Sequence, residues 1–340
     1  MAPLKDVTDV AFRQLVAKRG APDVFWTEFV SADGLYHTRP VRDRVSETSG
    51  PAFASVSNGT REMKKMTDAD LPTGKAGNPL MRDLQFTEEQ RPIVAQIFSS
   101  KPKMIEYATK LAAELGFDGV DINMGCPDRT VEKQGAGAAM IKTPKLAREV
   151  IRVAKEASAL PVSVKTRIGY STESLDEWLT TLLEANPVAI TLHLRTRKDL
   201  SLVSADWGQM KKAVEIRNRM NPDVLLIGNG DVRDLADARA KASESGCDGV
   251  MLGRAMFGNP WVFAGRTHED TPLALKLAAL IELANNFEKI SPPKNFSILK
   301  KHIKAFVTGF NGAAELRALL MQAENAAELA SVIAKHSAGE

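Results

Sequence analysis

Short apolar segments alternate with amphipathic helical segments along most of this chain, and no other feature constrains the fold as strongly. A strand followed by a helix and another strand requires parallel strands with helical crossovers. With a short first strand at residues 1–3, the chain has eight such units. This number predicts an α/β fold of the (β/α)8 TIM-barrel type rather than a doubly wound sheet. The other predicted strands cover residues 24–30, 93–98, 120–122, 161–166, 188–193, 224–227 and 249–252, and the predicted helices cover 9–18, 104–115, 144–157, 174–185, 207–220 and 235–245.

Two regions fall outside this alternation. Residues 39–91 are rich in charge, Gly, Ser and Pro, so we expect a long insertion near residues 40–90, with a surface loop at 57–83. After residue 271 the pattern is helical only, with predicted helices at 272–290, 298–310, 313–323 and 325–335. We therefore expect a barrel domain over residues 1–265 and a small C-terminal helical domain over residues 271–338.

Residues of distinctive chemistry stand where the predicted strands end. In TIM barrels, active sites are built at the carboxyl ends of the strands. One such residue could be a satisfied core side chain, whereas a set from different strands converges on one face. This pattern predicts a functional site at that face, with Pro3, Gln96, Asn123, Lys165, His193, Asn229 and Gly253 at its edge.

Cys126 follows the fourth predicted strand, which Gly125 and Pro127 terminate. A thiol held on a turn at a strand end is well placed to face a ligand, although most intracellular cysteines are small buried hydrophobes. The second cysteine, Cys247, lies far away in the sequence. The pair therefore indicates neither a disulfide framework nor a metal site, and it fits a reducing cytosol.

The bulk composition excludes several classes of protein. A hydrophobic fraction of 44% and a charged fraction of 26% are ordinary for a globular chain. No apolar run approaches the length of a membrane span, and the first residues lack the pattern of a signal peptide, so we expect a cytoplasmic protein without membrane association. The net charge of +3 permits an anionic partner without arguing for one.

The sequence Asn-Met-Gly-Cys-Pro at residues 123–127, followed by Lys-Gln-Gly-Ala-Gly at 133–137, resembles the signature of the tRNA-dihydrouridine synthases. These flavin enzymes reduce the C5–C6 double bond of uridine in tRNA. The first residues resemble the family as well, through Ala-Pro-Leu at 2–4 and Val-Thr-Asp at 7–9. The apolar residues that precede Ala-Pro in the family are absent, so we expect a short first strand. The resemblance implies an oxidoreductase with FMN as cofactor, NADPH or NADH as reductant and tRNA as substrate.

The resemblance also implies roles for individual residues. Cys126 would donate the proton to uracil C5, and a thiol with a pKa of roughly 8.5 is mostly protonated at neutral pH. Asn123 and Arg195 would bind the substrate. The cofactor phosphate would lie at the glycine-bearing ends of strands seven and eight, where backbone N–H groups can approach an anion. The implied cofactor-binding residues are Pro3, Leu4, Lys5, Gln96, Lys165, His193, Asn229, Gly230, Asp231, Gly253 and Arg254.

The family's C-terminal helical domain contacts tRNA, and residues 289–304 of this chain carry a lysine cluster without acidic residues. The lysines are Lys289, Lys294, Lys300, Lys301 and Lys304, and we expect the last four to contact phosphates of the RNA. We further expect the protein to act as a monomer. Two alternatives stay open at this point: an FMN-dependent barrel oxidoreductase acting on a free pyrimidine or an enone, and a non-catalytic RNA-binding barrel.

Overall fold

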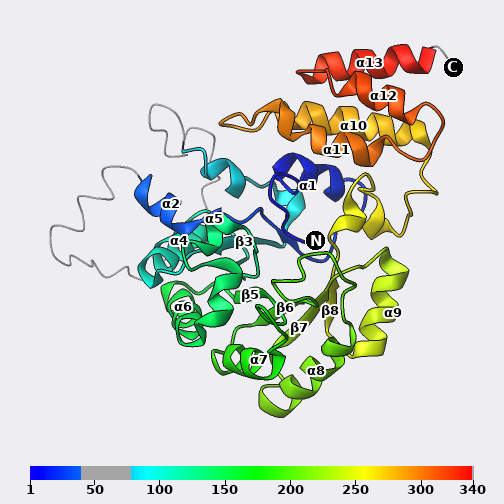
Figure 1. The fold of residues 1–340 in the computed structure, drawn as a ribbon. Coiled ribbons are helices and arrows are strands. Elements are labelled where there is room, and N and C mark those ends of the chain that lie inside the picture. Colours follow the sequence, from blue (N-terminus) through cyan, green and yellow to red (C-terminus); the bar gives the residue numbers. More distant parts are fainter. Residues whose placement is uncertain (40–77, 339–340) are drawn as a thin grey trace.

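The computed structural model describes residues 1–39 and 78–338, which form a parallel β-barrel surrounded by helices and extended by a C-terminal group of helices (Figure 1). The strands are hydrogen-bonded in the order β1-β3-β4-β5-β6-β7-β8, and β2 pairs with β3 next to β1. Every pairing is parallel, as the alternation of strands and helices requires. The strands are β1 (Phe25–Trp26), β2 (Val30–Ser31), β3 (Ile93–Phe98), β4 (Gly119–Met124), β5 (Val162–Arg167), β6 (Ala189–His193), β7 (Leu225–Asn229) and β8 (Gly249–Met251).

The first residues close the ring of strands. The Ala2 N–H donates to the Leu252 carbonyl at 2.8 Å, and the Met1 nitrogen donates to the Val24 carbonyl at 3.1 Å. Residues 1–2 thus bridge the end of β8 and the start of β1. The predicted strand at residues 1–3 is therefore wrong as a strand, because these residues are irregular and make only isolated backbone hydrogen bonds, although they lie between β8 and β1 where a barrel needs its first strand.

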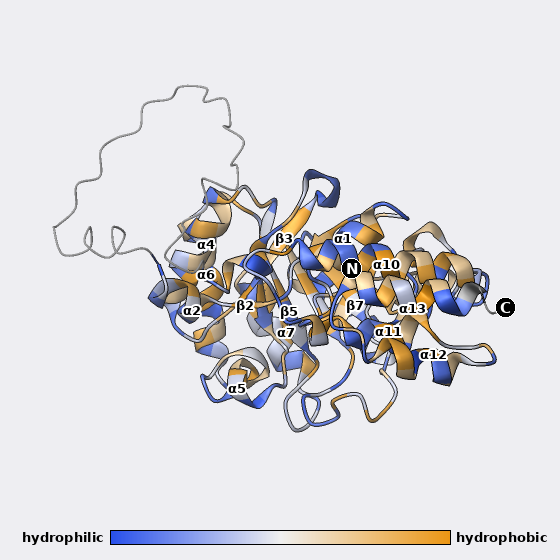
Figure 2. Cartoon of the chain, turned by 90° about the horizontal axis from the view of Figure 1, so that it is seen from above, coloured by the Kyte–Doolittle hydropathy of each residue, from blue (hydrophilic) through white to orange (hydrophobic). Residues whose placement is uncertain are grey.

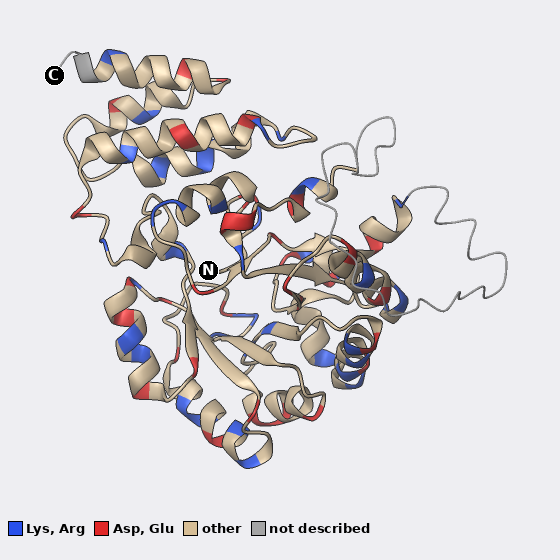
Figure 3. Ribbon diagram, turned by 180° about the vertical axis from the view of Figure 1, so that it is seen from behind, with Lys and Arg blue, Asp and Glu red and all other residues tan. Residues whose placement is uncertain are grey.

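Helices cover the outside of the barrel. Their inner faces are apolar at intervals of three and four residues, as in the helix at residues 144–157, which buries Ala147, Val150, Ile151 and Ala154. Lys, Arg, Asp and Glu lie on the outer faces, whereas the strands are almost free of charge (Figure 3). None of the described helices is both long and apolar enough to span a membrane. The helices of this layer are α1 (Val10–Ala17), α2 (Ala32–His37), α4 (Pro102–Glu114), α5 (Arg129–Glu132), α6 (Pro144–Ala157), α7 (Leu175–Glu184), α8 (Gly208–Met220) and α9 (Leu235–Ser245).

The ends of these helices follow local sequence signals. Asp9 caps α1 by accepting the Phe12 N–H at 3.0 Å. Asp234 caps α9 in the same way, and α9 ends at Gly246, whose φ of 73° is a left-handed conformation that glycine adopts without strain. The predicted bounds of α6 and α9 are confirmed. The predicted strand at 24–30 is interrupted at residues 27–29 and forms β1 and β2.

Residues 40–77 of the predicted insertion lie outside the described part of the chain. Residues 78–91 contain two short 3-10 helices, η1 (Met81–Leu84) and η2 (Glu88–Gln90). Asp83 and Gln90 are buried, and the Gln90 side chain accepts a hydrogen bond from Arg13 Nε at 3.0 Å. The prediction of a surface loop reaching to residue 83 is therefore wrong for Asp83, because its carboxylate is needed inside the protein.

The C-terminal helices pack against the first helix of the barrel (Figures 1 and 2). Glu282 of α10 pairs with Lys18 and Arg19 at the end of α1, at 3.0 and 2.6 Å. One continuous hydrophobic core contains residues from the barrel and from the C-terminal helices, so the division into two domains stays a prediction. The elements of this region are η4 (Arg254–Met256), η5 (Val262–Ala264), α10 (Leu273–Glu288), η6 (Phe296–Ile298), α11 (Lys300–Phe306), α12 (Ala313–Leu320) and α13 (Ala326–Ala338).

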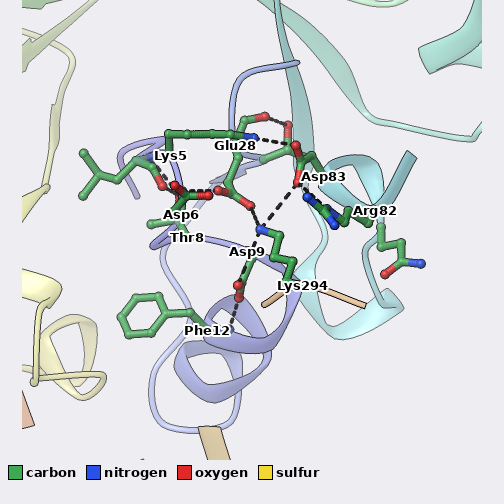
Figure 4. Close-up of polar contacts among 12 residues, drawn as sticks. Lys5, Asp6, Thr8, Asp9, Phe12, Glu28, Arg82, Asp83 and Lys294 are labelled. Carbon is green, nitrogen blue, oxygen red and sulfur yellow. Dashed lines mark hydrogen bonds and ion pairs between the residues drawn. The ribbon is translucent and has the colours of Figure 1, made fainter. Parts of the chain in front are cut away.

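Lys294, between α10 and α11, is buried among three carboxylates (Figure 4). Its Nζ lies 2.5 Å from Glu28 Oε2, 3.4 Å from Asp83 Oδ1 and 3.7 Å from Asp9 Oδ2. Asp83 also pairs with Lys5 at 2.5 Å, so the cluster includes a cation from the loop before α1. Buried ions are tolerated only where opposite charges compensate them. The prediction that Lys294 contacts RNA phosphates is therefore wrong, because its ammonium faces the protein interior.

We expect Lys294→Met to lower the free energy of unfolding by about 3–5 kcal/mol, because it removes the buried cation that three buried carboxylates share. Urea denaturation followed by circular dichroism measures this loss. Lys304→Met, which replaces an exposed lysine of α11, is the matched control and should change stability by less than about 0.5 kcal/mol. Glu28→Gln combined with Lys294→Met should recover part of the loss. Equal stability of Lys294→Met and the unchanged protein would contradict this role.

Candidate active site

A cavity of about 380 Å³ opens at the carboxyl ends of the barrel strands. Its lining comes from the first residues of the chain, from residues of β3 and β5, and from the ends of β4, β6, β7 and β8 with the loops that follow them; Phe29, between β1 and β2, also contributes. All the site residues predicted from the sequence line this one cavity, and their individual roles stay predictions. They are Pro3, Leu4, Lys5, Gln96, Asn123, Cys126, Lys165, His193, Arg195, Asn229, Gly230, Asp231, Gly253 and Arg254.

Other lining residues were missed from the sequence. Arg167 lies two positions after Lys165 on β5, so both side chains stand on the same face of the strand, and this spacing could have revealed it. Phe29 lies in the interruption between β1 and β2, and Leu200 and Ser201 lie in the loop after β6. These three carried no sequence signal that distinguishes them from ordinary loop residues.

The loop that carries Cys126 is held from three sides. The Asn123 side-chain oxygen accepts the N–H groups of Gly125 at 3.1 Å and Cys126 at 2.9 Å. Arg167 Nε donates to the Gly125 carbonyl at 2.8 Å, and the Ala138 N–H donates to the Cys126 carbonyl at 2.9 Å. The loop is therefore fixed before any ligand binds.

The glycine-rich run at 134–140 supplies one of these sides. Gly137 has a φ of 61°, and a Cβ added there would lie 2.7 Å from the Cys126 carbonyl oxygen. Only glycine lets the backbone approach this closely, so that the Ala138 N–H reaches the Cys126 loop. The two halves of the sequence motif thus meet at the thiol.

The Cys126 thiol holds its proton at neutral pH. Burial raises the pKa of Cys126, and the backbone N–H of Asp128 opposes this rise by favouring the thiolate. The Arg167 guanidinium also favours the thiolate, but burial prevails. A raised pKa makes the group a proton source rather than a nucleophile under ordinary conditions.

Lys165 is a half-buried cation in the cavity wall. Its Nζ donates to Asn229 Oδ1 at 3.1 Å, and Asn229 in turn donates from Nδ2 to the Met251 carbonyl at 2.8 Å. Burial lowers the pKa of Lys165 to about 8, with a further lowering by the charge of Arg167 and an opposing effect of Asp121. The side chain is therefore mainly charged at neutral pH, and it can stabilise negative charge on a bound ligand.

His193 is neutral, and its neighbour fixes its tautomer. Arg195 Nη1 lies 3.1 Å from His193 Nε2, and a guanidinium only donates hydrogen bonds, so Nε2 accepts and Nδ1 carries the proton. Burial and the charges of Lys165, Arg167 and Arg195 lower the pKa of His193 to about 2. The ring is therefore a hydrogen-bond donor through Nδ1 and not a cation.

Arg195 and Asp231 form the adjoining wall. Arg195 Nε donates to the Val203 carbonyl at 2.7 Å, and Nη2 pairs with the Asp231 carboxylate. The carboxylate also pairs with Arg254, and hydrogen bonding from Arg195 is the main cause that lowers the pKa of Asp231 to about 2. Three of the five Arg195 N–H donors therefore have partners, and a substrate contact by Arg195 would use one of the other two, on Nη1 or Nη2.

The ends of β7 and β8 can accept an anion. Gly230 has a φ of 131°, and within the described part of the chain the N–H groups of Gly230 and Gly253 donate to no protein group. Arg254 stands beside them with 67% of its side chain exposed. Unpaired backbone N–H groups and a guanidinium suit a phosphate. The Asp231 carboxylate repels one, so Asp231 would contribute to such a site through its backbone.

We expect the His193 ring to stay neutral, with its proton on Nδ1, at every pH from about 5 to 8, because its pKa lies far below the ordinary value of roughly 6.5. Nitrogen-15 NMR of the labelled histidines measures both the charge and the tautomer, with His193→Gln identifying the signal. Arg195→Met removes the donor to Nε2 and should allow the other tautomer. A ring that titrates near pH 6.5 in the unchanged protein would contradict this assignment.

Comparisons with known proteins agree with this geometry. The family described as dihydrouridine synthase (Dus) matches residues 75–338, more than half of the chain. A probable tRNA-dihydrouridine synthase 2 of Bacillus subtilis (strain 168) is 35% identical over 336 residues, covering 98% of this chain and 92% of the relative. A probable tRNA-dihydrouridine synthase of Staphylococcus aureus (strain COL) is 33% identical over 336 residues, covering 98% and 91%.

Among solved structures, a 2-naphthoyl-CoA reductase in complex with 2-naphthoyl-CoA has a TM-score of 0.51 at 10% sequence identity. The likeness covers 77% of this chain and 46% of that chain. At this identity the likeness concerns the fold alone, and it agrees with the barrel described above.

Proposed function

The chain belongs to the dihydrouridine synthase family, and we infer from this premise that it reduces the C5–C6 double bond of uridine in tRNA. The observation that carries the proposal is that the Cys126 thiol, the Lys165 ammonium and the glycine ends of β7 and β8 face one cavity. The near full-length match favours this reaction over an oxidoreductase acting on a free pyrimidine or an enone, and over a non-catalytic RNA-binding barrel. We also propose a cytoplasmic location.

The residues around the cavity fit FMN. When bound, FMN reduced by NADPH or NADH supplies the hydride that uracil C6 receives. The backbone of Gly230, Asp231 and Gly253 and the side chain of Arg254 would hold the phosphate. Lys165 would hold negative charge on the ring system, because its ammonium is buried and close to the cavity. The remaining residues proposed to line the ring are Pro3, Leu4, Lys5, Gln96, His193 and Asn229.

Cys126 would donate the second hydrogen, as a proton, to uracil C5. Charge develops on C5 and on the adjacent carbonyl as C6 receives hydride, and a protonated group beside C5 neutralises it. The raised pKa of Cys126 keeps the thiol protonated for this step. Asn123 donates one Nδ2 hydrogen to Gln96, and we propose that its second Nδ2 hydrogen orients a uracil carbonyl.

A uridine of folded tRNA has to leave its base stack to enter a cavity at the mouth of a barrel. We propose that the C-terminal helices hold the RNA while this happens. Of the lysines predicted to contact phosphates, Lys301 pairs with Asp6 at 3.1 Å and Lys300 donates to the Met321 carbonyl at 2.7 Å. Lys304 is exposed on α11, one helical turn beyond Lys300. The proposed RNA contact therefore rests on this exposed face of α11 and excludes Lys294.

Purified protein should bind FMN, and Arg254→Ala should weaken this binding about tenfold, because a charge-assisted hydrogen bond to phosphate is worth roughly 1.5–3 kcal/mol. Titration of the flavin fluorescence measures the affinity. Arg233→Ala is the matched control, since Arg233 is an exposed arginine in the loop between β7 and α9 that does not line the cavity. Absence of flavin absorbance after reconstitution with excess FMN would contradict the proposed cofactor.

Cys126→Ala should keep FMN and its reduction by NADPH but lose turnover on tRNA by about 10²–10⁴-fold, the usual contribution of a general acid. Mass spectrometry of dihydrouridine in tRNA measures turnover, and free uridine should be a poor substrate beside tRNA. The buried Cys247 provides the control, because Cys247→Ala should keep turnover. Unchanged reduction of tRNA by Cys126→Ala would assign the proton donor to another residue.

A further inference from the structure

A cluster of polar side chains lies beneath the Cys126 loop, and its central carboxylate, Asp121, has no role in the sequence motif or in the proposed chemistry. Gln96 on β3, Asp121 on β4 and Ser163 on β5 are side by side in register. Asp121 stands two positions before Asn123 on β4, so the two side chains lie on the same face of the strand. Asp121 is fully buried. A carboxylate at such a position costs stability unless it accepts hydrogen bonds, so its partners reveal what it does.

A chain of hydrogen bonds leads from this carboxylate to the thiol loop. Ser163 Oγ donates to Asp121 Oδ1 at 2.6 Å, and Gln96 Nε2 donates to Asp121 Oδ2 at 2.7 Å. Asn123 Nδ2 then donates to Gln96 Oε1 at 3.0 Å. The chain ends at the Asn123 side-chain oxygen, which accepts the backbone N–H groups of Gly125 and Cys126.

The two ends of this chain fix its direction. An ionised carboxylate only accepts hydrogen bonds, and backbone N–H groups only donate them. An amide side chain has an accepting oxygen and a donating nitrogen, so in isolation it fits between two neighbours in either orientation. With the acceptor at Asp121 and the donors at Gly125 and Cys126, a single orientation of Gln96 and of Asn123 satisfies every group.

We propose that Asp121 is a positioning residue for Cys126, which acts by orienting the Gln96 and Asn123 amides so that Asn123 presents its oxygen to the thiol loop. With the opposite orientation, the Asn123 nitrogen would face two N–H donors, and the loop would lose both bonds. Burial raises the pKa of Asp121 to about 6, and the hydrogen bonds from Ser163 and Gln96 oppose this rise. The carboxylate is therefore mostly ionised at neutral pH, and its oxygens then only accept hydrogen bonds.

Alkylation of Cys126 by iodoacetamide tests the position of the loop without any substrate. Cys247→Ala leaves Cys126 as the single cysteine of the full chain. In this background, Asp121→Ala should release the loop, expose the thiol and lower its pKa toward the ordinary value. Alkylation near neutral pH should then accelerate about three- to tenfold, since one pKa unit changes the thiolate fraction tenfold. Asp121→Asn keeps an oxygen that can accept from Gln96, and its rate should stay within about twofold of the unchanged protein.

Gln96→Met interrupts the same chain one link further on, and it should accelerate alkylation by a similar factor. Combined with Asp121→Ala it should add nothing beyond the larger single effect, because both changes break one pathway. Ser163→Ala is the matched control: it removes the other hydrogen bond to the carboxylate and leaves the amide chain intact, so the rate should not change. If Asp121→Ala does not fold, Gln96→Met and Ser163→Ala still decide between the outcomes. Unchanged alkylation in Asp121→Ala or Gln96→Met, or effects that multiply in the double variant, overturns the proposal.

The effect of Asp121 on turnover rests on the proposed function, whereas its effect on the position of the Cys126 loop does not. Asp121→Ala should lower turnover on tRNA about tenfold, as a displaced proton donor does, while reduction of FMN by NADPH persists. If Cys126→Ala keeps its turnover while alkylation responds to Asp121, the proposed proton donor fails and the positioning of the loop stands. If alkylation ignores Asp121 while Cys126 proves essential, the positioning role fails alone.

Discussion

The buried ammonium of Lys294 is the interaction on which the arrangement of this protein depends most. It brings together carboxylates from the cap of α1, from the segment between β1 and β2 and from η1, which are far apart in the sequence. Asp83 also forms an ion pair with Lys5, and the Glu28 side chain accepts the Asp6 N–H. The same carboxylates therefore hold the cavity-lining loop before α1. The C-terminal helices are thereby joined to one wall of the candidate active site (Figure 4).

Another part of the cavity wall carries more positive than negative charge. Among the residues that line the cavity, Arg167 and Arg195 are buried cations and Lys165 is a half-buried one, and the Asp231 carboxylate pairs with Arg195. Burial lowers the pKa of Lys165 to about 8 and that of Arg167 to about 10, because a charged group loses solvation when it is buried. An excess of poorly solvated positive charge suits a cavity that takes in a phosphate-bearing cofactor and a segment of RNA. Neutral His193 adds a directed donor without adding to that charge.

Much of the barrel and of its site could be predicted, because both depend on local patterns. The amphipathic pattern predicted α6 and α9 with their bounds, and parallel strands place all their carboxyl ends on one face, which gathered the predicted residues into one cavity. The burial of Lys294 could not be predicted, since a lysine in a basic stretch reads as solvated until its carboxylate partners are known. Closure of the ring by Met1 and Ala2 likewise depends on backbone contacts with distant strands.

The contact between Gly137 and Cys126 limits how this site can be altered. A side chain at position 137 would have to displace the Cys126 carbonyl, and the thiol would move with it. Residue 137 and the loop at 125–127 therefore behave as a single unit in mutagenesis, although they are separated along the chain. Efforts to change substrate preference have to redesign both segments together, and libraries that vary one position at a time will find this part of the barrel intolerant of substitution.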